Sequence, residues 1–234
     1  MLERLASTEN SGRISRYLIQ GDSMSGKSSI AFRVAYEVAE RGGSPLLICN
    51  RMKLESSFPL YCSMGEDLDA SISSQNLWRP EVLSKIDIKY ISTTAELKKI
   101  MAAIHCFRNL PSLIVIEDLS LLVDPARLVA RNDPAFIEKI IQLAAFIDDA
   151  IKFIECRFDD AQIRLMVVDE SFEGSFMLAL SRCIQDILLI RSHSFNPMLK
   201  CIYRRSIQTQ HNRLTEGELL ARSVRLQSDV LIIC

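Results

Sequence analysis

Residues 21–28 read Gly21-Asp22-Ser23-Met24-Ser25-Gly26-Lys27-Ser28, a full match to the pattern G-x-x-x-x-G-K-[ST]. A short apolar run at 17–19 precedes the match, and a helix-compatible segment at 27–41 follows it and stops at Gly42 and Gly43. A strand that leads into such a loop and a helix that leaves it form the context in which this pattern is meaningful. The glycines let successive backbone N–H groups point at one phosphate, and the helix adds its positive end. The sequence therefore predicts a phosphate-binding loop.

The residues of this loop have separate expected roles in holding a nucleotide. Lys27 reaches the β and γ phosphates, and the Ser28 hydroxyl binds Mg²⁺. The residues expected to contact the nucleotide are Gly21, Asp22, Ser23, Met24, Ser25, Gly26, Lys27, Ser28 and Ser29.

A loop of this kind needs a second acidic group to position Mg²⁺, usually at the end of a buried strand. Two apolar runs end in a pair of acids: 113–116, followed by Glu117 and Asp118, and 165–168, followed by Asp169 and Glu170. A carboxylate at such a sheet edge also occurs without any ligand role, because the edge is polar in this fold class. We favour Glu117 and Asp118 as the metal-binding acids, and we expect them to act with Lys27 as the catalytic residues.

Strand-like and helix-like segments alternate over most of the chain. Further strands are predicted at 46–49, 86–90 and 187–190, and the β-branched run at 113–116 is typical of a strand buried on both faces. Helices are predicted after the capping box of Thr93 and Glu96 and from Asp133 to about Phe158. The fold class is therefore α/β, with a mostly parallel sheet flanked by helices and a strand-rich C-terminal part. We expect a short polar segment over 1–13 and one domain over 14–234.

Composition excludes several classes of protein. The chain has 234 residues, of which 48% are hydrophobic and 24% charged, and its net charge is −1. These values exclude a disordered chain and a polycation that binds nucleic acid with its whole surface. No apolar stretch is long enough for a membrane span, and the polar N-terminus lacks the core of a secretory signal. Seven cysteines without a C-x-x-C pair indicate reduced core thiols rather than disulfides or a structural zinc site.

One segment is locally basic. From Arg191 to Arg225 there are seven Lys or Arg and two acids. Such a segment could follow a phosphate backbone, or it could be a solvated edge that keeps the protein soluble. The candidate contacts with single-stranded DNA are Arg191, Lys200, Arg204, Arg205 and Arg213.

The predicted helix at 134–158 is apolar on two sides. One side carries Phe136 and Ile140, and the other carries Ile137, Ile141 and Phe153. One side packs against the core, and we expect the second to face a partner protein.

Further short blocks accompany the loop in a fixed order along the chain. They are Lys85-Ile86 with Tyr90, Ser92-Thr93 and Glu96-Leu97, then Pro111-Ser112-Leu113, Leu165-Met166-Val167, and Ser228-Asp229 followed by apolar residues. With the spacing from the loop to the acidic strand, these blocks resemble the RecA-type recombinase core. Within that family the chain resembles the small recombinase paralogue that pairs with a SWIM-domain zinc protein in Shu-type complexes.

The resemblance implies a single RecA-like P-loop NTPase core without an N-terminal DNA-binding domain, with ATP and Mg²⁺ as its cofactors. It implies a heterodimer with the SWIM-domain zinc protein and binding of single-stranded DNA. It also implies a nuclear protein, without membrane attachment, that supports assembly of the recombinase filament in homologous recombination.

The chain departs from this family at two places. Recombinases carry a catalytic Glu directly after the strand that follows the loop helix, whereas Asn50 and Arg51 stand here and Glu55 lies further on. Glu117 takes the place of the family's Asp and is one methylene longer. We therefore expect a weak ATPase.

Two other functions stay open. A small-molecule kinase would need an arginine-rich lid, for which Arg127 and Arg131 are candidates. A scaffold subunit would keep the loop only as a vestige of a nucleotide site.

Overall fold

The computed structural model describes residues 16–23, 25–56, 78–125, 133–158, 161–170, 184, 186–192, 200–208 and 225–233. Across these ranges eight strands form one sheet in the order β3-β2-β4-β5-β1-β6-β7-β8. Their bounds are β1 Arg16–Gly21, β2 Pro45–Cys49, β3 Asp87–Tyr90, β4 Leu113–Glu117, β5 Arg164–Asp169, β6 Asp186–Ser192, β7 Lys200–Gln208 and β8 Arg225–Ile233. Within this order, the strands β3, β2, β4, β5, β1 and β6 run parallel to one another. Strand β7 pairs antiparallel with β6 and with β8. The predicted α/β class, with a largely parallel sheet, is confirmed.

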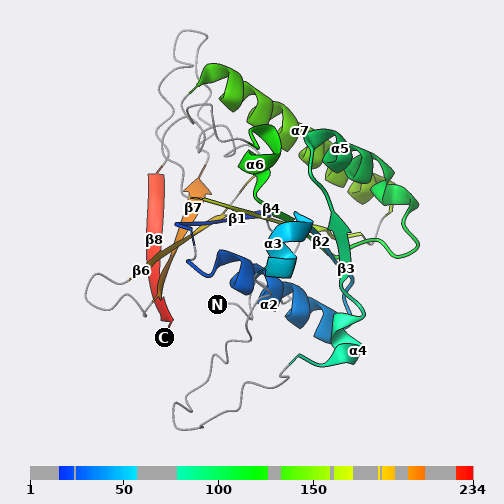
Figure 1. Cartoon of the computed structure of the whole chain (residues 1–234), viewed down its shortest axis with the longest axis horizontal. Coiled ribbons are helices and arrows are strands. Elements are labelled where there is room, and N and C mark those ends of the chain that lie inside the picture. The colour runs from blue at the N-terminus through cyan, green and yellow to red at the C-terminus, as the bar shows by residue number, and fades with distance from the viewer. Residues whose placement is uncertain are drawn as a thin grey trace.

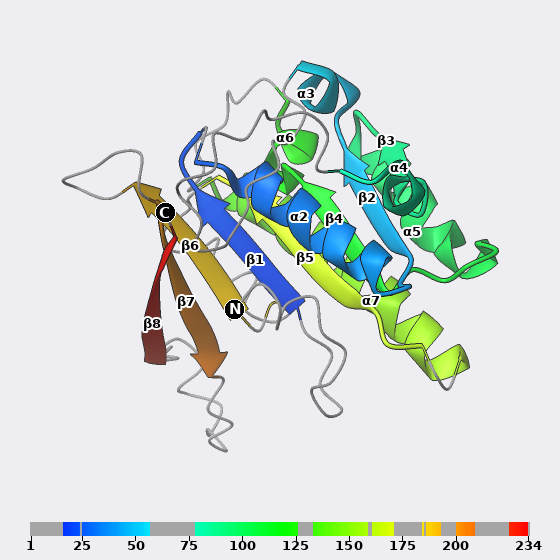
Figure 2. The same ribbon diagram turned by 90° about the horizontal axis from the view of Figure 1, so that it is seen from below.

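Helices cover both faces of the parallel part of this sheet (Figure 1, Figure 2). One face carries α2 and α4, and the other carries α5, α6 and α7. The bounds are α2 Lys27–Glu40, α3 Arg51–Ser56, α4 Pro80–Leu83, α5 Thr94–Ala103, the 3₁₀ helix η1 Ile104–Cys106, α6 Leu119–Val123 and α7 Pro134–Arg157. The sequence patterns predict α2, α5 and α7, whereas α3, α4 and α6 are too short to produce a periodic pattern.

Alternation along the strands separates two layers of core. In β4, Ile114 and Ile116 belong to the layer under α5, α6 and α7, while Leu113 and Val115 belong to the layer under α2. All four side chains are buried, as expected for a central strand of a parallel sheet. The strand predicted from its continuous β-branched run is therefore an interior strand of the sheet, buried on both faces.

Two helices begin at the residues that the sequence predicts. The Thr93 hydroxyl accepts a hydrogen bond from the Glu96 backbone N–H at 3.2 Å, and the Glu96 carboxylate accepts one from the Thr93 N–H. At the start of α7, the Asp133 carboxylate accepts hydrogen bonds from the N–H groups of Ala135 and Phe136. Both caps satisfy backbone donors that the helix itself leaves unpaired.

The two apolar sides of α7 have different environments. Phe136, Ile140 and Ile147 are buried in the core, whereas Ile141 is 37% exposed and Phe153 is 49% exposed. The prediction that one side of α7 packs against the core is confirmed. The second side is partly open in the isolated chain.

Other expectations fall partly outside the described residues. The polar segment 1–13 and Met24 lie outside them. Among the cysteines whose burial the structure describes, Cys49 is buried but Cys106 and Cys156 are exposed, so the expectation of core thiols was wrong for these two. Cys106 lies in η1, directly after α5, and Cys156 lies near the end of α7. No helix in the described ranges has the length and apolar character needed to cross a bilayer.

The adjacent residues Ile140 and Ile141 of α7 provide a test of this packing. We expect Ile140→Ala to lower the free energy of unfolding by about 2–5 kcal/mol, because it leaves a cavity in a fully buried site. Ile141→Ala should cost less than about 1 kcal/mol, because its side chain is part exposed. Urea denaturation of both variants measures the difference, and equal losses would contradict the assignment of the two sides.

Candidate functional site

The predicted loop and the predicted acids meet at one edge of the sheet. Three adjacent strands, β1, β5 and β4, end there, since Gln20 pairs with Asp169 and Glu117 pairs with Val168. The carboxyl ends of parallel strands lie at the same edge, which is where ligands bind in open α/β sheets. The fold thus brings together residues that the sequence separates widely.

The loop between β1 and α2 has the backbone shape that its glycines allow. Gly26 has φ 86°, a left-handed conformation that favours glycine. At Gly21, a Cβ atom would lie 2.6 Å from the Ser25 Oγ and 2.8 Å from the Ile190 carbonyl oxygen, so no side chain fits. The Ser25 N–H donates to the Asp22 carbonyl at 3.2 Å, which closes the turn. No side chain caps the first turn of α2, so backbone N–H groups of that turn point at the space beside the loop.

Lys27 folds back on its own loop. Its side chain is buried, and its Nζ donates to the Asp22 backbone oxygen at 2.6 Å. Burial lowers the pKa of Lys27, and the positive charge of Lys53 lowers it further, while the charges of Asp118, Glu170 and Asp169 act in the opposite direction. The ammonium group therefore lies within the field of both acidic pairs predicted from the sequence.

Glu117 is the most buried part of the predicted metal site, at 6% exposure. The Ser28 side chain lowers the pKa of this carboxyl group, so the two residues expected to hold Mg²⁺ lie close to each other. Burial raises the pKa of Glu117, and it outweighs the lowering caused by Lys53 and by Ser28. The neighbouring thiol of Cys49 also has its pKa raised by burial, to about 12, and is therefore inert as a nucleophile at neutral pH.

Asp118 has an unusual backbone conformation. Its φ of 53° is the only positive value of a non-glycine residue in the described ranges. Its N–H donates to the Val168 carbonyl at 2.7 Å, which extends the pairing between β4 and β5 by one bond before α6 begins. This turn directs the Asp118 carboxylate to the edge of the sheet, beside Glu117.

Lys53 is a site residue that sequence reasoning did not find. It lies on α3, and its Nζ is 2.7 Å from the Asp118 Oδ2 and 3.6 Å from the Glu117 Oε2. Burial alone would lower the pKa of Lys53, but the charges of Glu117 and Asp118 and their hydrogen bonds raise it. No motif marks this lysine, because only the short helix α3 and the end of β4 together define its position.

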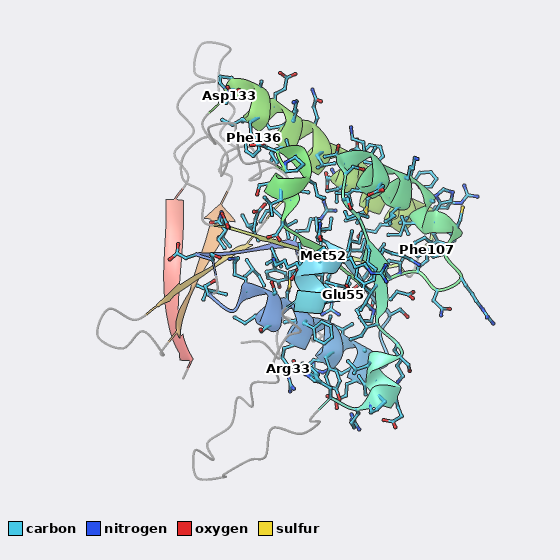
Figure 3. The ribbon with its side chains drawn as sticks, in the orientation of Figure 1. Arg33, Met52, Glu55, Phe107, Asp133 and Phe136 are labelled. Atoms are coloured by element: carbon cyan, nitrogen blue, oxygen red, sulfur yellow. The ribbon has the colours of Figure 1, made fainter. Side chains whose placement is uncertain are left out.

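The first glutamate after β2, Glu55, lies two residues beyond Lys53 on α3. Glu55 accepts a hydrogen bond from the Arg51 Nε at 2.8 Å, and both side chains are largely exposed. Figure 3 labels Glu55 and Met52 on this helix. Glu55 is thus engaged at the surface by its own helix, whereas Lys53 contacts the acidic pair.

The second acidic pair is built differently from the first. Asp169 is 1% exposed, and its carboxylate accepts hydrogen bonds from the Ser120 N–H at 2.8 Å, the Ser120 Oγ at 2.7 Å and the Glu170 N–H at 2.8 Å. These bonds hold the first turn of α6 against the end of β5. Burial raises the pKa of Asp169 to about 6, against the lowering effect of these bonds.

The donor atoms at Ser28 and Glu117 fit a magnesium ion. Mg²⁺ prefers oxygen ligands and is bound in phosphate sites by one or two carboxylates together with water and the phosphates themselves. No cluster of three or more His, Cys, Asp or Glu side chains with metal-binding geometry occurs in the part of the chain that the structure describes. The acid pair alone therefore does not form a complete cage for a metal.

For four of the candidate DNA contacts, the structure describes the position in a strand and the pairing with the neighbouring strand. Arg191 lies on β6 opposite Cys201, and Lys200, Arg204 and Arg205 lie on the adjacent strand β7. Arg213 and the two lid candidates, Arg127 and Arg131, lie outside the described residues. A scan against protein-family models finds no match to this chain, and a search of curated proteins finds none either.

The buried carboxyl group of Asp169 predicts a pH-dependent stability. Its raised pKa means that the folded protein binds this proton more tightly than the unfolded chain, so stability decreases as pH rises through the interval between the two values. The change from 3.8 to about 6 corresponds to on the order of 3 kcal/mol.

The measurement is urea denaturation of wild type and Asp169→Asn between about pH 4 and pH 7, a range that includes the raised pKa of about 6. The variant loses hydrogen bonds at every pH, but only the wild type has a carboxyl group at position 169 that titrates. We expect the stability advantage of the wild type to shrink as pH rises. An advantage that stays constant across this interval would contradict the assignment.

Proposed function

We propose that this chain is a RecA-like P-loop NTPase that binds ATP and Mg²⁺ at residues 21–29. The observation that carries the proposal is the position of Ser28, at the start of α2, beside the buried carboxylate of Glu117, at the end of β4 and at the same edge of the sheet. The same edge carries Lys27 and an uncapped helix start. An anion-binding helix end, a buried lysine and a hydroxyl–carboxylate pair are the parts that a Mg²⁺-nucleotide site requires.

Each residue has a defined part in this site. The loop N–H groups bind phosphate oxygens, and Lys27 exchanges its bond to the Asp22 carbonyl for the terminal phosphates. Ser28 and Glu117 would hold Mg²⁺, with Asp118 beside them. When bound, the ion neutralises charge on the phosphates.

We propose only weak ATP hydrolysis. The side chain nearest to the acidic pair from the segment after β2 is Lys53, which is a cation and not a base. Glu55 is bonded to Arg51 instead. A water-orienting carboxylate from this segment is therefore absent among the residues described at the site, and the rate contribution of general-base catalysis is lost.

We further propose a role in homologous recombination, as a nuclear mediator subunit. In this role the chain pairs with a SWIM-domain zinc protein, binds single-stranded DNA and supports assembly of the recombinase filament. Two observations support it: the ordered sequence blocks that resemble the Shu-type paralogue, and the pairing of β6 with β7, which carry four of the five basic candidates on adjacent strands. The partly open side of α7, with Ile141 and Phe153, is the candidate surface for the partner.

One observation favours a second candidate, a scaffold subunit with a vestigial site. Lys27 and Lys53 are both bonded to oxygen atoms of the chain itself. A site whose lysines are already bonded to oxygen atoms of the chain can be retained for structural reasons, without binding a nucleotide.

The Lys27→Ala variant separates these two functions. We expect its affinity for a fluorescent ATP analogue to fall by about one to two orders of magnitude, since a charge-assisted bond to phosphate is lost. Lys139→Ala, at an exposed position of α7, is the control and should bind as the wild type does. Fluorescence anisotropy gives the affinities. Equal binding by wild type and Lys27→Ala, or no binding by either, would favour the scaffold.

Affinity purification of the tagged chain from its native cells tests the recombination role. We expect a SWIM-domain zinc protein to co-purify in stoichiometric amount, identified by mass spectrometry. An Ile141→Asp variant should lose that partner, because a charge replaces apolar contact area. A tagged chain that purifies alone would refute the heterodimer, and a screen for phosphotransferase activity would follow. Retention of the partner by Ile141→Asp would refute the assigned surface.

A further inference from the structure

The short helix α3 places a lysine on the acids of the proposed metal site. Leu54 is buried in the same core layer as α2 and anchors α3 to the sheet. The preceding residue, Lys53, contacts both Asp118 and Glu117 through its Nζ, at 2.7 Å and 3.6 Å. Its side chain is 31% exposed, so the ion pairs lie at the mouth of the site and not deep in the core.

These two carboxylates carry the charge that would attract Mg²⁺. A divalent cation and an ammonium group cannot occupy the same carboxylate oxygens at these distances, because two positive centres would then lie within a few ångströms of each other. Of the two carboxylates, Asp118 lies closer to the Lys53 Nζ, while Glu117 also lies beside Ser28. Lys53 therefore provides the positive charge that balances these two carboxylates in the structure described here.

We propose that Lys53 is a built-in counter-ion that competes with Mg²⁺ for Asp118 and Glu117, and so sets the Mg²⁺ concentration at which the site accepts a nucleotide. Lys53 is then a positioning residue: it holds the two carboxylates in place and leaves them when the metal-bound nucleotide enters. This inference rests on the proposed nucleotide site. It goes beyond that proposal because it predicts that removal of a positive charge strengthens Mg²⁺-dependent binding.

A phosphate-contacting lysine would have the opposite signature. The positive charge of Lys53 lowers the pKa of Lys27, so the two ammonium groups lie near enough to repel each other. If Lys53 bound the terminal phosphate, its loss would weaken the binding of ATP. Whether removal of Lys53 strengthens or weakens nucleotide binding therefore distinguishes a competitor of the metal from a ligand of the phosphate.

The experiment compares Lys53→Met with wild type in a titration of Mg²⁺ at fixed protein and fluorescent ATP analogue. We expect half-maximal binding at a Mg²⁺ concentration about fivefold lower in the variant. A factor of about five in the equilibrium constant corresponds to the loss of one of the stronger partly exposed ion pairs. Lys53→Arg keeps the charge and should behave as the wild type. Arg51→Met removes a positive charge from the same helix, away from the acids, and should leave the midpoint unchanged.

A second readout uses Mg²⁺ alone. Without its ammonium partner, the acid pair of Lys53→Met is left uncompensated, so we expect lower thermal stability than wild type and a larger rise in Tm on addition of Mg²⁺. Lys53→Gln repeats the test with a polar side chain if the methionine variant does not fold.

The outcomes separate the two proposals. A raised Mg²⁺ midpoint or weaker binding in Lys53→Met and Lys53→Gln would overturn the competition, as would an equal shift in Arg51→Met. Failure of every protein, wild type included, to bind the nucleotide would overturn the nucleotide site itself and this inference with it.

Discussion

The burial of carboxylates at one edge of the sheet is the constraint on which the rest of the site depends. β4 is covered on both faces, and its last residue, Glu117, remains buried. A buried carboxylate is costly unless hydrogen bonds or an opposite charge meet it. From α2, the Ser28 side chain stabilises the charged form of this carboxylate, and from α3 Lys53 provides an opposite charge. The loop helix and the segment after β2 are therefore tied to the same carboxyl group.

Asp169 shows a second solution to the same problem. It is more buried than Glu117, yet its described partners are the neutral groups of Ser120 and the Glu170 N–H. These bonds hold the start of α6, which follows directly on the left-handed turn at Asp118. One acid thus orients the turn that presents the other. Asp169 consequently fits a structural role, and Glu117 and Asp118 fit contact with ligands.

The sequence predicts well those features that depend on neighbouring residues. The apolar runs locate β1, β2, β4 and β5, and the pair Thr93 and Glu96 locates the start of α5 within a residue. The motif at 21–28 and the acids at 117 and 118 are found because each lies at the end of an apolar run that predicts a strand. The contact of Lys53 with Asp118 could not be predicted in this way, because it joins positions 65 apart in the chain. The exposure of Cys106 and Cys156 also depends on where helices end, which apolar neighbours in sequence do not reveal.

The order of the strands also connects the loop to the basic segment. Gly21 ends β1 opposite Ile190 of β6, and a Cβ at Gly21 would lie 2.8 Å from the Ile190 carbonyl oxygen. The residue after Ile190 is Arg191, and β6 pairs along its length with β7. No linker separates the proposed nucleotide loop from the strands proposed to contact DNA. A Cβ atom at position 21 would press on the β6 backbone. Only glycine therefore lets the loop begin where β1 and β6 are paired.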